Sequence, residues 1–283
     1  METHILNGLI IGGSYVLIAV GLTLIFGILD AINLAHGEVY MLGAYVLYFL
    51  FGVWGLNYWA ALILATGIIG IFGIVIEKLG FRPLRKQPLL NTMLVSIALA
   101  ILLQNLAMLF WGADPKVVKT AMSEEVIQFF GVSLTVQRLV VLIVGAVAII
   151  LLHLLIEKTR IGKAMRAVAQ DKDAAALMGI SIDRVYTFTF AVGSALAAVA
   201  GALIAPIFQI FPTMGFVPFI KAFTVVILGG LGNVIGAIYA GFILGIAESL
   251  GAAYISTPYK DSFAFIILII MLLIKPSGLM GRS

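Results

Sequence analysis

Residues 5–29 read ILNGLIIGGSYVLIAVGLTLIFGIL, without one charged side chain. An α-helix rises about 1.5 Å per residue, so about 20 apolar residues cross a hydrocarbon core of roughly 30 Å. The stretch is therefore predicted to span a membrane. It follows Met-Glu-Thr-His rather than a positively charged segment, and it is longer than the apolar run of about 7–15 residues in a signal peptide. We interpret it as a retained span.

Three more uncharged blocks follow, at residues 39–76, 89–113 and 139–156, and the first of them is long enough for two crossings. Hydrophobic residues make up 63% of the chain and charged residues 11%, whereas a soluble domain carries about 25% charged residues. The sequence predicts an all-α protein, a polytopic transmembrane helix bundle with about eight or nine spans. Residues 1–283 are expected to form a single transmembrane domain.

The basic residues predict the orientation. Residues 77–88, residues 157–184 and the C-terminus together hold 12 of the 17 Lys and Arg residues. Because cytoplasmic loops carry an excess of Lys and Arg, these segments are placed in the cytoplasm. The prediction is a multi-pass protein of the cell inner (plasma) membrane, with its N-terminus outside and its C-terminus cytoplasmic. The excess of basic residues behind the net charge of +4 is explained by these cytoplasmic loops. Nucleic acid is therefore not expected as a partner.

Asn33, His36 and Glu38 form the most unusual polar cluster, because they lie between two apolar spans. A polar side chain inside a membrane usually faces the protein interior or a water-filled path. Two interpretations stay open: the cluster lines a passage or its gate, or it is a short interfacial loop with His36 and Glu38 capping a helix. A metal site is disfavoured, since one His and one Glu are an incomplete ligand set.

Four more polar residues lie within apolar sequence. Gln104 and Asn105 are expected to make interhelical hydrogen bonds more often than to contact a solute. Glu248 is ionisable but lies near the end of a span. Lys221 is expected to extend its ammonium group toward an interface.

A glycine-rich run, Gly229-Gly230-Leu231-Gly232-Asn233, interrupts the second half of the chain as residues 33–38 interrupt the first. Paired helix breaks point to inverted repeats with a passage between them. Gly230 and Asn233 therefore join the earlier cluster as candidates for the passage or its gate. The run lacks the Gly-Lys-Ser/Thr ending of a phosphate-binding loop, so energy for uphill transport must come from a partner or an ion gradient. The chain has no cysteine, which excludes disulfides and thiolate metal sites.

Residues 158–184 are the longest hydrophilic segment and contain two short helical runs. Asp171 and Asp173 are suited to begin the second run and Gly179 to end it. A short helix with a face of small residues is suited to dock in a groove of another protein. The alternative is a solvated connector, which the spacing alone slightly favours.

Three motifs in this sequence resemble the motifs of one protein family, and they occur in the order expected for that family. They are Gly21-Leu22-Thr23-Leu24-Ile25-Phe26-Gly27-Ile28 with Asn33-Leu34-Ala35-His36-Gly37-Glu38, then Gly162-Lys163 with Arg166-Ala167, Asp171, Ala174-Ala175 and Gly179-Ile180, then Val225 to Ala237. Together they resemble the branched-chain amino-acid ABC transporter permeases. The chain is similar to the shorter, H-type subunit, because it has no long extra N-terminal helix.

The resemblance implies a function and partners. The chain would be a permease subunit of an importer for leucine, isoleucine and valine, or for related small polar solutes, and not an enzyme. Its partners would be a second homologous permease, two cytoplasmic ATP-binding subunits, a periplasmic solute-binding protein and the lipid bilayer. No cofactor is expected on this chain, since ATP and Mg would bind the ATPase subunits. Residues 158–184 would form the cytoplasmic coupling loop, and its expected coupling residues are Gly162, Arg166, Asp171, Ala174, Ala175 and Gly179.

The competing class is a self-sufficient secondary transporter or channel. It would need an ion site or a carboxylate relay within the membrane. Only Glu38 and Glu248 are candidates for such a site, so this alternative is disfavoured. A membrane-embedded enzyme is disfavoured too, because the three histidines suggest no nucleophile-and-base set.

Overall fold

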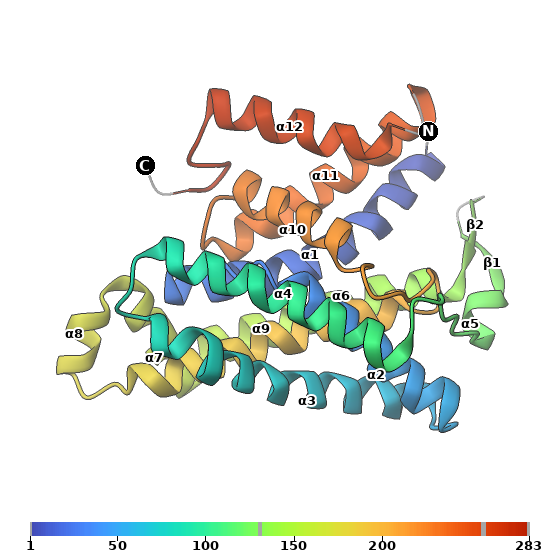
Figure 1. Ribbon diagram of the computed structural model, residues 1–283. Helices are drawn as coiled ribbons and strands as arrows, with labels where there is room; N and C mark the ends of the chain where they lie inside the picture. The colour runs from blue at the N-terminus through green and yellow to red at the C-terminus, as the bar shows by residue number, and fades with distance from the viewer. Residues whose placement is uncertain (1, 130–131, 256–258, 282–283) are drawn as a thin grey trace.

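The computed structural model describes residues 2–129, 132–255 and 259–281. Helices dominate this part of the chain, and one hairpin of two short strands accompanies them (Figure 1). The elements are α1 (Glu2–Leu29), α2 (His36–Leu47), the π-helix η1 (Tyr48–Val53), α3 (Tyr58–Ile76), the π-helix η2 (Glu77–Phe81), the 3₁₀ helix η3 (Arg82–Leu84), α4 (Leu89–Trp111), α5 (Ala121–Glu124), β1 (Val126–Phe129), β2 (Val132–Thr135), α6 (Val136–Lys158), α7 (Arg160–Gln170), α8 (Lys172–Leu177), α9 (Ile182–Ile204), α10 (Phe216–Gly229), α11 (Val234–Tyr254) and α12 (Lys260–Ile274).

Within the described residues, six helices are long and apolar enough to cross a membrane: His4–Leu29, Tyr58–Leu84, Leu89–Trp111, Val136–Lys158, Ile182–Ile204 and Val234–Tyr254. Shorter apolar helices, such as α10, add to them. The predicted polytopic helix bundle is confirmed. The six long spans account for part of the eight or nine crossings expected from the sequence, and α2 with η1, α10 and α12 are the shorter helices available for the rest.

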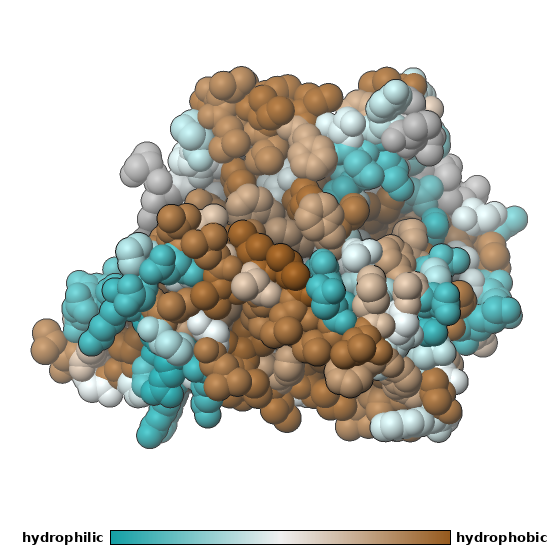
Figure 2. Space-filling model, in the orientation of Figure 1, coloured by the Kyte–Doolittle hydropathy of each residue, from teal (hydrophilic) through white to brown (hydrophobic). Residues whose placement is uncertain are grey.

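Two long helices, α1 and α9, form the centre of the bundle. In the most apolar part of α1, 78% of the residues are buried, against 17% in α4 and in α6. α1 packs against α9, α10 and α11, and α9 also packs against α2 and α3. The outer helices leave broad hydrophobic faces on the surface (Figure 2), as a bundle surrounded by lipid requires.

The packing relates the first three helices to α9, α10 and α11. α3 packs on α9 as α11 packs on α1, and α2 contacts α9 as α10 contacts α1. α1 and α9 run in opposite directions (Figure 1). This arrangement supports the predicted inverted repeats. It changes their correspondence, however, because the break before α2 matches residues 205–215 before α10, and not Gly230 to Asn233.

Reciprocal glycine contacts mark the centre of this pseudosymmetry. A side chain at Gly21 would come within 2.8 Å of the Gly193 carbonyl oxygen, and one at Gly193 within 3.0 Å of the Gly21 carbonyl oxygen. Gly37 and Gly215 exclude side chains from each other in the same way. Since a Cβ atom does not fit at such distances, glycine allows the two repeats to touch through their backbones.

Local capping explains where several helices begin. The Asn57 side chain accepts a hydrogen bond from the Trp59 amide at the start of α3, and Asn233 accepts one from the Gly236 amide at the start of α11. Such caps satisfy amides that have no partner within the helix. The polar stretch 114–137 includes the short helix α5 and the antiparallel strands β1 and β2. Its last residue, Gln137, is buried in α6, where it donates to the Tyr58 hydroxyl group and to the Leu203 carbonyl oxygen.

Candidate functional site

The break before α2 lies inside the bundle. Asn33 and His36 are completely buried and Glu38 is 3% exposed. The Nε2 atom of His36 lies beside Gly21, in the second half of α1, where a Cβ atom would be 3.0 Å away. The Asn33 side chain accepts a hydrogen bond of 3.1 Å from the Ala35 amide. The cluster is therefore a buried break before α2. The capping role in the second interpretation is not observed, because among the described residues no side chain caps the start of α2.

Glu38 and Gln104 meet across two helices. The Gln104 amide donates a hydrogen bond of 2.7 Å to Oε1 of Glu38, as expected for an amide within a membrane span. Asn105 instead donates to the Ile101 carbonyl oxygen of its own helix. Beside the Glu38–Gln104 pair lies a cavity of about 290 Å³. Its lining residues come from the break, α2, α4 and the first turn of α10: Leu34, Glu38, Ile97, Ala100, Ile101, Gln104, Phe216 and Phe219.

The two glycine-run candidates lie elsewhere. Gly230 adopts a positive φ of 102° and packs against Ser277 and Gly281 near the C-terminus. The amide group of Asn233 donates to the Met280 carbonyl oxygen at 2.8 Å. Neither residue lines the cavity at Glu38. The structure thus brings Asn33, His36 and Glu38 together and separates them from Gly230 and Asn233, which hold the C-terminal segment.

Lys221 corrects one prediction from the sequence. Its side chain is 4% exposed and does not extend to an interface. Its ammonium group pairs with Glu248, and with Asp261 at 2.7 Å. The Tyr15 hydroxyl group donates to Glu248 at 2.8 Å. This cluster joins α1, α10, α11 and α12, because a cation buried this deeply requires charged partners.

The hydrophilic segment 158–184 folds as predicted into two short helices. The Asp171 side chain accepts hydrogen bonds from the amides of Asp173 and Ala174, both at 2.9 Å, and so begins α8. Gly179 follows the helix with a φ of 79°, which favours glycine. Leu177 and Met178 are 90% and 83% exposed, so the end of α8 presents apolar side chains to its surroundings.

The six expected coupling residues divide into two groups. Ala174 is exposed, as are Asp171 and Gly179, whereas Ala175 is 4% exposed and packs inward. A side chain at Gly162 would collide with the carbonyl groups of Leu155 and Ile156. The Arg166 guanidinium group donates to the Ile156 carbonyl oxygen and pairs with Glu157. Gly162, Arg166 and Ala175 therefore hold the segment in place, while the others lie at its surface.

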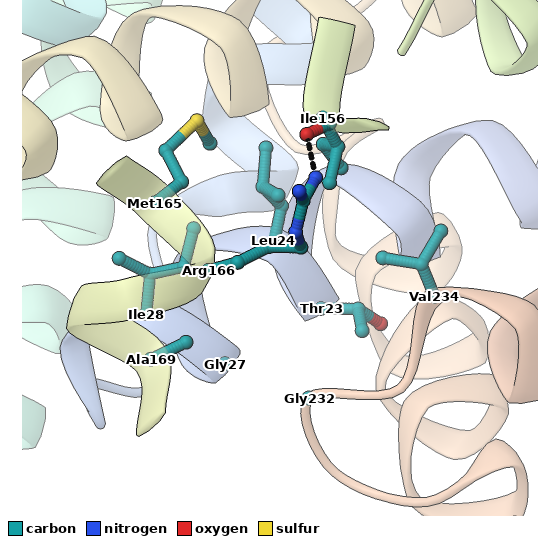
Figure 3. A pocket seen from close by; sticks show the side chains of 10 residues that line it. All are labelled: Thr23, Leu24, Gly27, Ile28, Ile156, Met165, Arg166, Ala169, Gly232 and Val234. Atoms are coloured by element: carbon teal, nitrogen blue, oxygen red, sulfur yellow. Dashed lines mark hydrogen bonds between the residues drawn. The ribbon is translucent and has the colours of Figure 1, made fainter. Parts of the chain in front are cut away.

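A second cavity, of about 130 Å³, lies where this segment meets the bundle. Figure 3 shows α7 supplying Met165, Arg166 and Ala169 on one side, with α1 and the loop at Gly232 beside them. A side chain at Gly27 would come within 2.9 Å of the Gly232 Cα atom. α7 therefore lies against both repeats, at α1 and at the Gly232 loop. Among the described residues, no group of three or more His, Asp and Glu side chains is placed to hold a metal ion.

Comparisons with known proteins decide the family. A family model described as the permease component of the branched-chain amino acid transport system matches residues 4–272. The high-affinity branched-chain amino acid transport system permease protein LivH of Salmonella typhimurium is 39% identical over 98% of this chain and 94% of that protein. BraD of Pseudomonas aeruginosa, which carries the same description, is 37% identical over 99% and 95%.

The chain belongs to this permease family. A solved structure of PsaBC from Streptococcus pneumoniae in complex with Fab matches 96% of the permease and 91% of its own chain, with a TM-score of 0.51 and 14% identity. That likeness shows the fold alone.

One more polar network of the permease joins its two basic loops. Arg85 forms ion pairs with Glu77 and Asp183, and Arg82 pairs with Asp183 as well. The Thr187 hydroxyl group donates to Glu77 at 2.7 Å. Since Asp183 lies at the start of α9, shortly after α8, these contacts place residues 77–88 and 157–184 on the same side of the bundle. The sequence gives the charges but not their pairing, because the partners are about a hundred positions apart.

Proposed function

We propose that the permease is one of two membrane subunits of an ATP-driven importer that moves leucine, isoleucine and valine into the cell. The observation that carries the proposal is the near-full-length similarity to LivH and BraD, whose names give this substrate class. The chain has no phosphate-binding loop, so two separate ATPase subunits supply the energy. A periplasmic solute-binding protein delivers the substrate, and a second permease completes the passage.

The buried break at Asn33, His36 and Glu38 supports a passage at the centre of this bundle. Substrate sites of transporters built from repeats lie near the middle of the membrane, at the interface of the repeats and beside broken helices. The α2 break meets α10 at such an interface, through Gly37 and Gly215. Gly230 and Asn233 contribute by fixing the end of α10 and the start of α11, and we assign them to the gate at the opposite end of α10.

Coupling to the ATPase is assigned to α8. Its exposed end at Leu177 and Met178 offers apolar side chains for a groove on a partner, in the manner of a short helix bound in a groove. α7 connects α8 to α1 and to the Gly232 loop, so a displacement of α8 reaches both repeats. Gly162 and Arg166 make this connection stiff through their contacts with the end of α6.

The test is purification and transport with the chain's neighbouring gene products. We expect a second permease and two ATPase subunits to co-purify in mild detergent. In proteoliposomes, leucine uptake should require ATP, and the loaded binding protein should raise ATP hydrolysis. A chain that purifies alone and moves solute without ATP would instead be a self-sufficient transporter, and Glu38 and Glu248 would be the first residues to change.

A variant of α8 tests the coupling assignment separately. Leu177→Asp places a charge on the proposed docking face, so we expect the ATPase subunits to be lost from the complex while the second permease remains. Lys172→Ala is the matched control, because Lys172 is exposed on the same helix. Unchanged recovery of the ATPase subunits with Leu177→Asp would contradict the assignment.

A further inference from the structure

The strongest unexplained group is the Glu38 carboxylate. It is 3% exposed, and only its Oε1 atom accepts a hydrogen bond, from Gln104. Within the described residues, the second oxygen, Oε2, has no hydrogen-bond partner. No basic residue lines the cavity at Glu38. A buried carboxylate without a cation nearby is costly in a membrane and by default marks a functional site.

The other walls of the cavity are apolar. Beside the two polar side chains, the cavity is lined by Leu34, Ile97, Ala100, Ile101, Phe216 and Phe219. Four of the lining residues, at positions 97, 100, 101 and 104, share one face of α4 because they are three or four residues apart. The volume of about 290 Å³ is close to the lower end of small-molecule pockets, roughly 300 Å³. The cavity therefore combines an aliphatic environment with one carboxylate and one amide.

The side-chain amide of Gln104 forms the polar end of the cavity together with Glu38. A glutamine side chain has two N–H donors, and Gln104 gives one of them to Glu38. The other remains for an acceptor in the cavity. Glu38 lies in the first turn of α2, and Phe216 and Phe219 lie in the first turn of α10. Two half-helix N-termini thus meet at the cavity, and N-termini of this kind favour anionic groups of a substrate.

The side of the cavity formed by α4 is exposed in this chain, and Figure 2 shows hydrophilic side chains interrupting the hydrophobic surface over the second half of α4. The polar residues in that half of the helix are Gln104 and Asn105. Lipid is a poor neighbour for them and for a carboxylate behind them. Water or protein, and not lipid, is therefore expected on this face.

We propose that this cavity is a substrate site within the permease, which takes a zwitterionic amino acid with an aliphatic side chain. The Glu38 carboxylate pairs with the α-ammonium group, the free N–H of Gln104 donates to the α-carboxylate, and Leu34, Ile97 and Phe219 enclose the side chain. The proposal rests on the proposed function and adds the residues that select the substrate inside the membrane, independently of the binding protein.

The experiment measures ligand binding to the whole permease–ATPase complex in phospholipid nanodiscs, without the binding protein. L-Leucine and 4-methylpentanoate, which is leucine without its ammonium group, are titrated and followed by saturation-transfer difference NMR. In Glu38→Gln we expect the Kd of leucine to rise at least about tenfold, as expected for loss of a charge-assisted hydrogen bond. The Kd of 4-methylpentanoate should change by less than about twofold, which a merely structural role of Glu38 would not predict.

A second pair of variants decides the matter if Glu38→Gln does not assemble. Ile97→Trp should fill the cavity from α4 and abolish leucine binding, whereas Leu102→Trp should not, because Leu102 is 52% exposed and lies outside the cavity. Equal leucine affinity in wild type and in either cavity variant overturns the proposal. So does the absence of leucine binding by a wild-type complex that transports leucine. A wild-type complex that does not transport leucine with ATP contradicts the proposed function instead.

Discussion

Lys221 lies in a buried ion pair, so its substitution tests how far that pair stabilises the bundle. Lys221→Met leaves Glu248 buried without its cation, and breaking a buried pair in this way costs about 3–5 kcal/mol. We expect a clearly lower midpoint of thermal aggregation in detergent. Lys221→Met combined with Glu248→Gln should recover much of the loss, since both charges are then removed. A single variant as stable as wild type would contradict the buried ion pair.

A substitution at Asp171 tests the hydrogen bonds that cap the start of α8. Its carboxylate caps the first amides of α8, and replacing a cap by alanine costs about 1 kcal/mol. Asp171→Ala should therefore speed amide hydrogen exchange in residues 173–178 about fivefold, whereas Asp171→Ser should retain most of the protection. Equal exchange rates in Asp171→Ala and wild type would show that α8 does not depend on this cap.

At the residue scale, what the sequence predicts depends on the distance between partners. The start and end of α8 follow from Asp171 and Gly179, which act within three or four residues, and the structure has both. The partners of Lys221 do not follow from the sequence, because Glu248 and Asp261 lie 27 and 40 positions away. The Glu38–Gln104 bond joins residues 66 positions apart, so the chain alone identifies both polar residues without showing that they meet.

At the scale of elements, the close contact of α2 with α10 depends on two glycines. A Cβ atom at Gly37 would lie 2.5 Å from the Gly215 carbonyl oxygen and 2.7 Å from the Phe219 Cβ atom. Gly37→Ala should therefore separate the two half-helices and greatly reduce the yield of folded complex. Gly67→Ala is the matched control, because a Cβ atom at Gly67 meets nothing within 4 Å and alanine favours helix.

The yield of folded complex is measured by size-exclusion chromatography of the detergent extract. A Gly37→Ala variant that elutes like wild type would show that α2 and α10 tolerate separation. Gly67 lies within apolar sequence, whereas Gly37 lies between His36 and Glu38. The sequence therefore marks the segment at Gly37 as unusual without showing that it packs against Gly215. The repeats explain the difference, since Gly37 lies where the two halves of the chain cross, whereas Gly67 lies on the outer side of α3.

At the scale of the whole molecule, the bundle and its long spans follow from apolar length alone. The correspondence of the repeats does not, because the break before α10 (residues 205–215) carries no polar cluster like that at Asn33 to Glu38. The ion pairs of Arg82 and Arg85 with Asp183 put the two most basic segments on one side. This agrees with the expectation that both loops face the cytoplasm. Whether the side they share is the cytoplasmic one is a separate prediction.

Cysteine labelling tests which side of the membrane each loop faces. Each introduced cysteine is then the single labelled site, because the chain has no cysteine of its own. Asp114 and Lys172 are exposed, and the single long span α6 separates them along the chain. They are therefore expected on opposite sides of the membrane, with Lys172 in the segment that is predicted to be cytoplasmic. In intact spheroplasts, a membrane-impermeant maleimide should label Asp114→Cys and spare Lys172→Cys, and both should react after the membrane is opened. An excess of Lys and Arg in cytoplasmic loops gives this expectation. Labelling of Lys172→Cys alone in intact cells would invert the molecule, placing α8 on the periplasmic side, where no ATPase subunit can reach it.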